Sequence, residues 1–349
     1  MMNATTLGMK HLHITFCLGL LLMLSACSTD IDLYADYKQV PVVYGLLDAN
    51  ADTNFIKITR AFYVEGDAYQ VALNPDSSYY PGKLDVRLVE YCNGDSLREI
   101  ILDTVTIHNK EHGVFYAPDQ KLYYTTEPIC QNTSSKRYSY RLKAMLPEST
   151  LNTQTAMVGN SSFGIQSLGV NFSKQYFGMV PRQFLFRPAI NGRFYQVTMS
   201  FTFLEQRTPD SDSVPRTMTW EVGIFNEEFC AQNAEGDAYA FPYRPEDFYT
   251  SLTSFLGNDT AIVGLSRFIN DYPVEVRIVA GGEELRQYVF NNDPNNGFIE
   301  GDNEFSLIDD GYGVFSSRMT TKQAVRMGGE TVPELVANRY WGFKFIGGK

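Results

Sequence analysis

The feature that most constrains this fold is a succession of short segments in which apolar and polar residues alternate, each followed by a turn signal. Lys83–Glu90 places Leu84, Val86 and Leu88 on one face, as a half-buried strand does. Asn93 and Gly94 follow, and this dipeptide favours a tight β-hairpin. Similar segments recur at roughly ten-residue spacing, which predicts an immunoglobulin-like β-sandwich over residues 38–150.

A second β-rich domain is expected over residues 160–349, after a junction at Leu151–Gly169. Pro245–Leu256 has apolar residues at helical spacing, acids in its first turn and Gly257 at its end, which predicts a helix. A shorter helix is expected over Pro333–Asn338. The expected fold is therefore mainly all-β, with two β-sandwich-like domains and one or two short helices in the second. Its clearest predicted strands are Phe184–Phe186, Phe194–Phe203, Thr217–Phe225 and Val274–Val279.

Four further segments of the chain carry local expectations. The uninterrupted apolar run Val40–Leu47 predicts a fully buried strand, and residues 64–83 resemble a loop. Gly281 with Gly282 predicts a hairpin turn, and residues 290–304 predict a long polar loop.

The N-terminal residues predict export and lipidation. Lys10 precedes the apolar run Ile14–Leu24, which is too short to cross a hydrocarbon core of ~30 Å as a helix. The run ends at Leu24-Ser-Ala-Cys27, the pattern of a bacterial lipobox, so we expect a signal peptide over residues 1–26 and acylation, for example with palmitate, of Cys27. A plain secreted protein that happens to carry Cys27 is the alternative.

Residues 27–38 form the expected lipidated tether. Asp30 and Asp32 resemble the surface-export tether of Bacteroidetes lipoproteins, and the alternative is a solvated linker. The expected location is the outer membrane, lipid-anchored and facing the cell surface. Stable attachment to the membrane through the acyl chains on Cys27 needs no transmembrane helix.

The charge balance bears on the partners of this chain. Its 40 acidic residues outnumber 29 basic ones, which gives a net charge of −11 and argues against binding to nucleic acid. The chain holds 22 Tyr and 24 Phe, which favour strands and also suit binding surfaces. The pairs Tyr79-Tyr80 and Tyr123-Tyr124 could stack on sugars, although sheet packing explains them equally simply.

His108-Asn-Lys-Glu-His112 matches the zinc pattern of inverted metallopeptidases, which needs both histidines one turn apart on a helix. The flanks Val105–Ile107 and Gly113–Tyr116 favour extended structure instead, so we predict a hairpin loop. We expect no catalytic residue, no metal and no cofactor. Cys92 and Cys130 are the pair expected to form a disulfide, and the alternative is that they and Cys230 are three buried thiols.

The lipobox, the acidic tether and three further stretches, Pro41–Leu47, Phe55–Phe62 and Asp310–Arg318, together resemble uncharacterised Bacteroidetes envelope lipoproteins of the domain of unknown function 4249 family. The resemblance implies outer-membrane residence, β-sandwich domains and partnership with a TonB-dependent transporter. It implies no catalytic residues. The expected function is therefore non-enzymatic binding as an accessory to nutrient uptake. A structural or adhesive surface protein, or an enzyme whose site is assembled from distant loops, are the alternatives.

Overall fold

The computed structural model describes residues 40–61, 67–179, 181–232, 237–257, 265–292, 308 and 311–346. Val40–Lys349 is one compact unit, and its elements are mainly strands, which confirms the predicted all-β class. The strands are β1 Pro41–Asp48, β2 Asn54–Arg60, β3 Asp85–Cys92, β4 Asp95–Ile101, β5 Asp103–Ile107, β6 Gln120–Thr125, β7 Tyr138–Met145, β8 Thr150–Ala156, β9 Gly164–Ile165, β10 Gly169–Val170, β11 Arg182–Arg187, β12 Phe194–Gln206, β13 Val214–Asn226, β14 Tyr239–Tyr243, β15 Ser266–Ile269, β16 Val274–Gly281, β17 Tyr312–Met327 and β18 Phe343–Phe345. The helices are α2 Ala68–Ala72, α3 Pro75–Ser78, the 3₁₀ turn η1 Lys174–Tyr176, α4 Glu227–Gln232, α5 Pro245–Leu256, α6 Glu283–Asn291 and α7 Thr331–Ala337.

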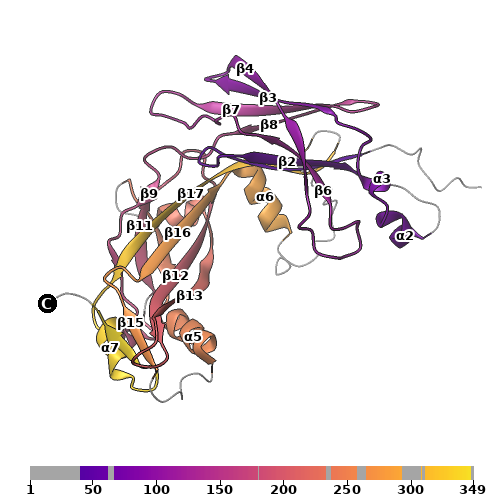
Figure 1. The fold of residues 1–349 in the computed structure, drawn as a ribbon. Helices are drawn as coiled ribbons and strands as arrows, with labels where there is room; N and C mark the ends of the chain where they lie inside the picture. Colours follow the sequence, from indigo (N-terminus) through magenta and orange to yellow (C-terminus); the bar gives the residue numbers. More distant parts are fainter. Residues whose placement is uncertain are drawn as a thin grey trace, which may run out of the picture. The chain divides into compact units, whose positions relative to one another are not determined.

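The N-terminal strands form a β-sandwich. The sheet β4-β3-β7-β8 packs against β1, β2, β6 and β5, which belong to an eleven-stranded sheet (Figure 1). Alternation explains the core between them, because every second side chain of each strand points inward. The inward residues include Val43, Ile56 and Ile58 from one sheet and Val86, Leu88, Tyr140 and Leu142 from the other.

The chain changes sheets at Leu102. β4 ends at Ile101 in one sheet, and β5 begins at Asp103 in the other sheet. Leu102 is buried between them and its N–H donates to the Val86 carbonyl. This single buried residue therefore makes the corner that closes the sandwich.

A second hydrophobic core lies among the later strands. Its residues come from β12, β13, β16, the second half of β17, the small sheet β14-β11-β9 and α5. Aromatic rings dominate it, and Phe172 stacks on Phe248 of α5 with ring centroids 4.5 Å apart. The helix Pro245–Leu256 has the predicted bounds and ends at Gly257, whose φ is +54°. The apolar stripe of α5 is buried against this core, as predicted from its spacing.

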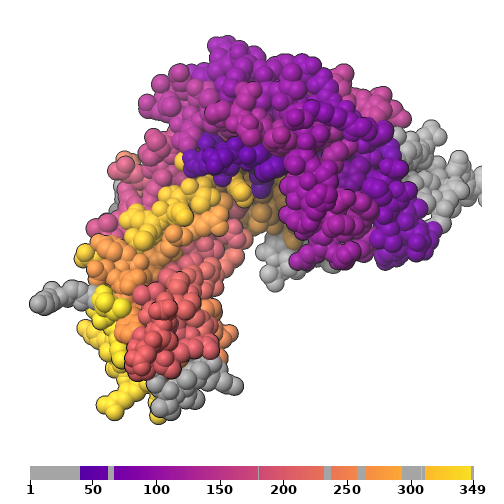
Figure 2. Space-filling model, in the orientation of Figure 1, coloured from indigo at the N-terminus to yellow at the C-terminus, as the bar shows by residue number. Residues whose placement is uncertain are grey.

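One long strand serves both cores. Residues Tyr312–Arg318 of β17 pair in parallel with β1, and Arg318–Val325 pair antiparallel with β16. Phe315 belongs to the first core and Val325 to the second. In Figure 2 the yellow C-terminal residues accordingly lie directly beside indigo residues of the N-terminal strands. The predicted domain boundaries, 38–150 and 160–349, stay predictions, and β17 links the regions on either side.

Several local expectations were wrong. Among the described residues of the predicted second domain there are four short α-helices rather than one or two, and α2 and α3 lie in the region expected to be a loop. Gly281 and Gly282 make no hairpin turn, because Gly282 is the N-cap of α6. The expected junction begins later than predicted, since Thr150–Ala156 forms β8. β1 is not fully buried, since Tyr44 is 43% exposed on its outer face.

Candidate functional site

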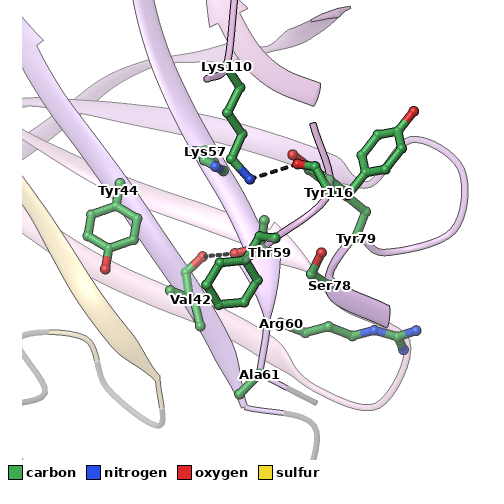
Figure 3. Close-up of a pocket in the computed structure, with 11 residues that line it drawn as sticks. Val42, Tyr44, Lys57, Thr59, Arg60, Ala61, Ser78, Tyr79, Lys110 and Tyr116 are labelled. Atoms are coloured by element: carbon green, nitrogen blue, oxygen red, sulfur yellow. Dashed lines mark hydrogen bonds between the residues drawn. The ribbon is translucent and has the colours of Figure 1, made fainter. Parts of the chain in front are cut away.

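A cavity of about 490 Å³ opens on the outer face of the N-terminal sandwich (Figure 3). Four stretches of the chain line it: β1, the end of β2, the end of α3 with the following residue, and the loop between β5 and β6. Its residues are Val42, Tyr44, Lys57, Thr59, Arg60, Ala61, Ser78, Tyr79, Lys110, Phe115 and Tyr116.

The floor of the cavity is the antiparallel pair β1 and β2. Val42 lies opposite Thr59 and Tyr44 lies opposite Lys57. Because side chains alternate along a strand, these four face away from the core that Val43 and its neighbours fill. The outer face of this pair therefore carries aromatic, apolar and cationic groups instead of the usual small polar ones.

One wall is the loop that joins β5 to β6, residues 108–119. Its ends are held together by His108, whose Nδ1 lies 2.5 Å from the Asp119 carboxylate. The Tyr116 N–H donates to the Ala72 carbonyl at 2.9 Å, and its hydroxyl donates to Asp119 at 3.3 Å. These contacts hold Lys110, Phe115 and Tyr116 over the floor.

A second wall, adjoining the first, comes from α3. Asn74 caps this one-turn helix by accepting a hydrogen bond from the Asp76 N–H, and Pro75 occupies its first position. Tyr79 follows the helix, and its hydroxyl donates to the Asp119 carbonyl at 3.5 Å. Arg60 donates to the Asp76 carbonyl at 2.7 Å, so the helix is tied to the floor.

The cavity is positively charged. Among the lining residues that the structure describes, Lys57, Arg60 and Lys110 are basic and none is acidic. Lys57 donates to the side-chain oxygen of Gln120 at 3.2 Å and Lys110 donates to the Tyr116 carbonyl at 2.7 Å. Both acceptors are neutral.

The pKa of Lys57 is lowered, first by burial and then by the charge of Lys110. Elsewhere in the described part of the chain, the lysines that form salt bridges are Lys83, Lys143 and Lys322. Two ammonium groups in the cavity thus face each other without a carboxylate among the described residues to neutralise them.

Two aromatic contacts extend this surface. The Tyr44 ring meets Tyr288 of α6 edge-on, with centroids 6.1 Å apart. The pKa of Tyr44 is raised by burial and by its hydrogen bond with Tyr288. On the same outer face, two residues before Lys57, Phe55 is 41% exposed and packs on Tyr124. An aromatic surface therefore continues from the cavity along β2 and β6.

The structure confirms some of the predictions made for individual residues and leaves others untested. His108 and His112 lie in a hairpin loop, as predicted, and the described residues contain no group of three or more His, Cys, Asp or Glu that could hold a metal ion. Tyr79 lines the cavity, whereas Tyr80 and Tyr123 are buried. Residues 293–307, which include most of the predicted polar loop 290–304, and the lipidation residue Cys27 lie outside the described residues.

Cys92, Cys130 and Cys230 are free thiols in this structure. Cys92 and Cys130 both lie near the Tyr138 hydroxyl, whose pKa is raised first by burial and then by these two thiols. Their disulfide is not formed here and stays a prediction. Burial raises the pKa of the Cys230 thiol to about 12, so it acts as a small core residue.

The cavity residues were missed because no single motif contains them. The loop 108–119 was assessed for its histidines, yet its Lys110, Phe115 and Tyr116 are the ones that line the cavity. A usable signal was present in β1, where Val42 and Tyr44 put apolar groups on both faces of a strand at the surface of a sandwich.

No helix in the described residues is long and apolar enough to cross a membrane. No protein-family model matches the chain, and no curated protein matches it.

Proposed function

We propose that this chain is a lipid-anchored outer-membrane protein that acts by non-enzymatic binding, as an accessory to a TonB-dependent transporter in nutrient uptake. The observation that carries the binding role is the cavity between β1, β2, α3 and the β5–β6 loop. Its volume lies within the range of roughly 300–1,000 Å³ typical of small-molecule sites. Its aromatic rings and cationic donors are groups that hold and orient a ligand.

The anchoring and the partner rest on sequence alone. The lipobox that ends at Cys27 supports acylation, and the resemblance to envelope lipoproteins supports a transporter partner. A ligand captured beside an outer-membrane channel could be handed to it directly, because the anchor keeps both proteins in one membrane plane. The role is thus one of capture and delivery.

The test is a mild-detergent pull-down of the tagged protein from its native host, with Cys27→Ala as the matched control. We expect the lipidated protein to partition into the membrane fraction and to recover a large outer-membrane β-barrel transporter. The Cys27→Ala protein should do neither. Recovery of no transporter by the lipidated protein would overturn the uptake role.

The alternative, a structural or adhesive surface protein, is favoured by one observation. Strand β13 pairs with β12 along one edge, and its other edge pairs with no strand among the described residues. An open edge can add a strand from another chain. If the protein forms polymers in a concentration-dependent way, and lysine substitutions on the outward edge of β13 abolish them, the result would support this alternative over the uptake role.

A further inference from the structure

The sign of the cavity is opposite to that of the chain. The protein carries a net charge of −11, yet the described residues that line the cavity include Lys57 and Lys110 and no acidic residue. Scattered surface lysines are usually solvated or paired with carboxylates, as Lys83 is with Asp103. Lys57 and Lys110 instead converge on one space from different strands and loops, as Figure 3 shows.

Two cationic groups held close together destabilise the folded protein unless an anion neutralises their charge. Lys57 is partly buried and feels the charge of Lys110, and both effects disfavour its charged form. An anion placed between the two ammonium groups would remove that repulsion and accept a charge-assisted hydrogen bond from each. The hydroxyl of Ser78 lines the same space and could donate a further hydrogen bond, whereas the hydroxyl of Thr59 already donates to the Val42 carbonyl.

The remaining lining requires more than a small inorganic ion. Tyr79, Phe115 and Tyr116 supply ring surface, and the volume of about 490 Å³ accommodates an organic molecule. Lys110 itself lies 5.6 Å from the centre of the Phe115 ring, so the charged and aromatic parts of the lining adjoin. The ligand that matches both parts has a ring and a negative group.

We infer that this cavity binds a small organic anion, with its carboxylate or phosphate between Lys57 and Lys110 and its ring against Tyr79, Phe115 and Tyr116. This inference rests on the proposed binding function and names its ligand class. It also assigns roles within the cavity: the two lysines select charge, and the aromatic residues select a ring-sized body.

The test uses pairs of probes that share a ring and differ in charge. Calorimetry on the purified full-length protein compares glucuronate and glucose 6-phosphate with glucose, and benzoate with benzyl alcohol. Because a hydrogen bond to a charged group contributes enough for at least about tenfold in affinity, we expect the best-bound anion to bind at least about tenfold more tightly than its neutral partner.

Lys57→Gln and Lys110→Gln should each weaken the binding of that anion about tenfold. Lys322→Gln on β17, an exposed lysine outside the cavity, is the matched control and should change nothing. Thermal unfolding of each variant checks that it folds. If one of the two lysine variants fails to fold, the other is enough to test the role of the lysines.

The outcomes separate this inference from the proposed function. Equal affinities for charged and neutral probes, no binding of any probe, or full binding by both lysine variants would each overturn the anionic ligand. Binding of the neutral sugar, weakened by Tyr116→Ala, would overturn it while keeping a binding role. Anion binding without any recovered transporter would support the ligand class and overturn the uptake role.

Discussion

At the scale of single residues, the most consequential charge lies far from the cavity. Glu205 of β12 accepts hydrogen bonds from Arg216 of β13 and from Arg267 of β15, and both Glu205 and Arg267 are buried. The Arg267 guanidinium also donates to the Trp341 carbonyl at 2.7 Å and lies 6.0 Å from the centre of the Phe203 ring and 5.9 Å from that of the Phe343 ring. The cluster ties three strands of the second core together.

Removing the carboxylate charge should therefore destabilise the fold. Glu205→Gln leaves the guanidinium of Arg267 buried without this counter-charge, which costs about 3–5 kcal/mol. Urea unfolding measures the change. Glu275→Gln, which removes an exposed partner of Lys322, should cost less than about 1 kcal/mol. Equal losses of unfolding free energy in the two variants would contradict a larger contribution from the buried Glu205–Arg267 pair.

Glu334 of α7 makes folding stability depend on pH. Burial raises the pKa of this carboxyl, but hydrogen bonds from the Ser173 hydroxyl, the Lys174 N–H and the Tyr249 hydroxyl outweigh it, so the pKa is lowered overall. A carboxyl with a lower pKa in the folded state stabilises the protein above its unfolded pKa, near 4.5, and loses that effect as the pH falls.

Glu334→Gln should accordingly be less stable than the wild type at pH 7, by about 1–3 kcal/mol. The difference should shrink as the pH drops below about 4.5, because there the carboxyl of the unfolded chain becomes protonated before that of the folded protein. Urea unfolding at pH 7 and pH 3.5 measures both values. Glu330→Gln, at the exposed N-cap of the same helix without a side-chain cap, is the control. A difference that persists at low pH would contradict the linkage.

At the scale of elements, the decisive contact is the parallel pairing of β1 with β17. Gly313 lies opposite Val43 in that pairing and has a φ of +105°. A Cβ at this position would overlap the Val43 carbonyl oxygen. Glycine is required here for close approach and for its backbone conformation.

Gly313→Ala should lower the free energy of unfolding by roughly 1–3 kcal/mol, since it adds strain at a positive φ. Hydrogen exchange should show the loss concentrated in β1 and the first half of β17. Gly113→Ala is the matched control, because a Cβ there meets nothing within 4 Å and its φ is not positive. A Gly313→Ala variant as stable as the wild type would show that the pairing of β1 with β17 tolerates a side chain at this position without a loss of stability.

At the scale of the whole molecule, the N-terminal sandwich depends on the C-terminal strand. Phe315 and Ile308 complete its core, and β17 covers the edge of β1 that does not pair with β2. A fragment of residues 40–158 would lose these apolar contacts and expose that edge.

We therefore expect the fragment 40–158 to lack cooperative unfolding and dispersed amide NMR signals, whereas the full chain shows both. A synthetic peptide covering residues 308–327, added in excess, should restore order, because it supplies the missing strand. Independent folding of the fragment would favour the sequence-based boundary at residue 150 and assign β17 a secondary role.

The local sequence was sufficient to predict the backbone conformation wherever residues close in sequence determine it. Asn93 and Gly94 adopt the positive φ angles of a tight turn between β3 and β4, as their sequence predicts. The helix from Pro245 to Leu256 carries its start and stop signals within its own residues. The predicted strands likewise include β3, β12 and β16.

The amino-acid sequence by itself determined the strand-rich class, the Asn93-Gly94 hairpin and the bounds of α5, because these depend on periodicity and capping within a few residues. Only the tertiary structure decided that Tyr312–Arg318 pairs with β1, and that Lys57, Tyr79 and Lys110 share one cavity. Pairing of distant strands depends on which apolar faces pack together. A cavity built from four separate stretches exists only once that packing has formed.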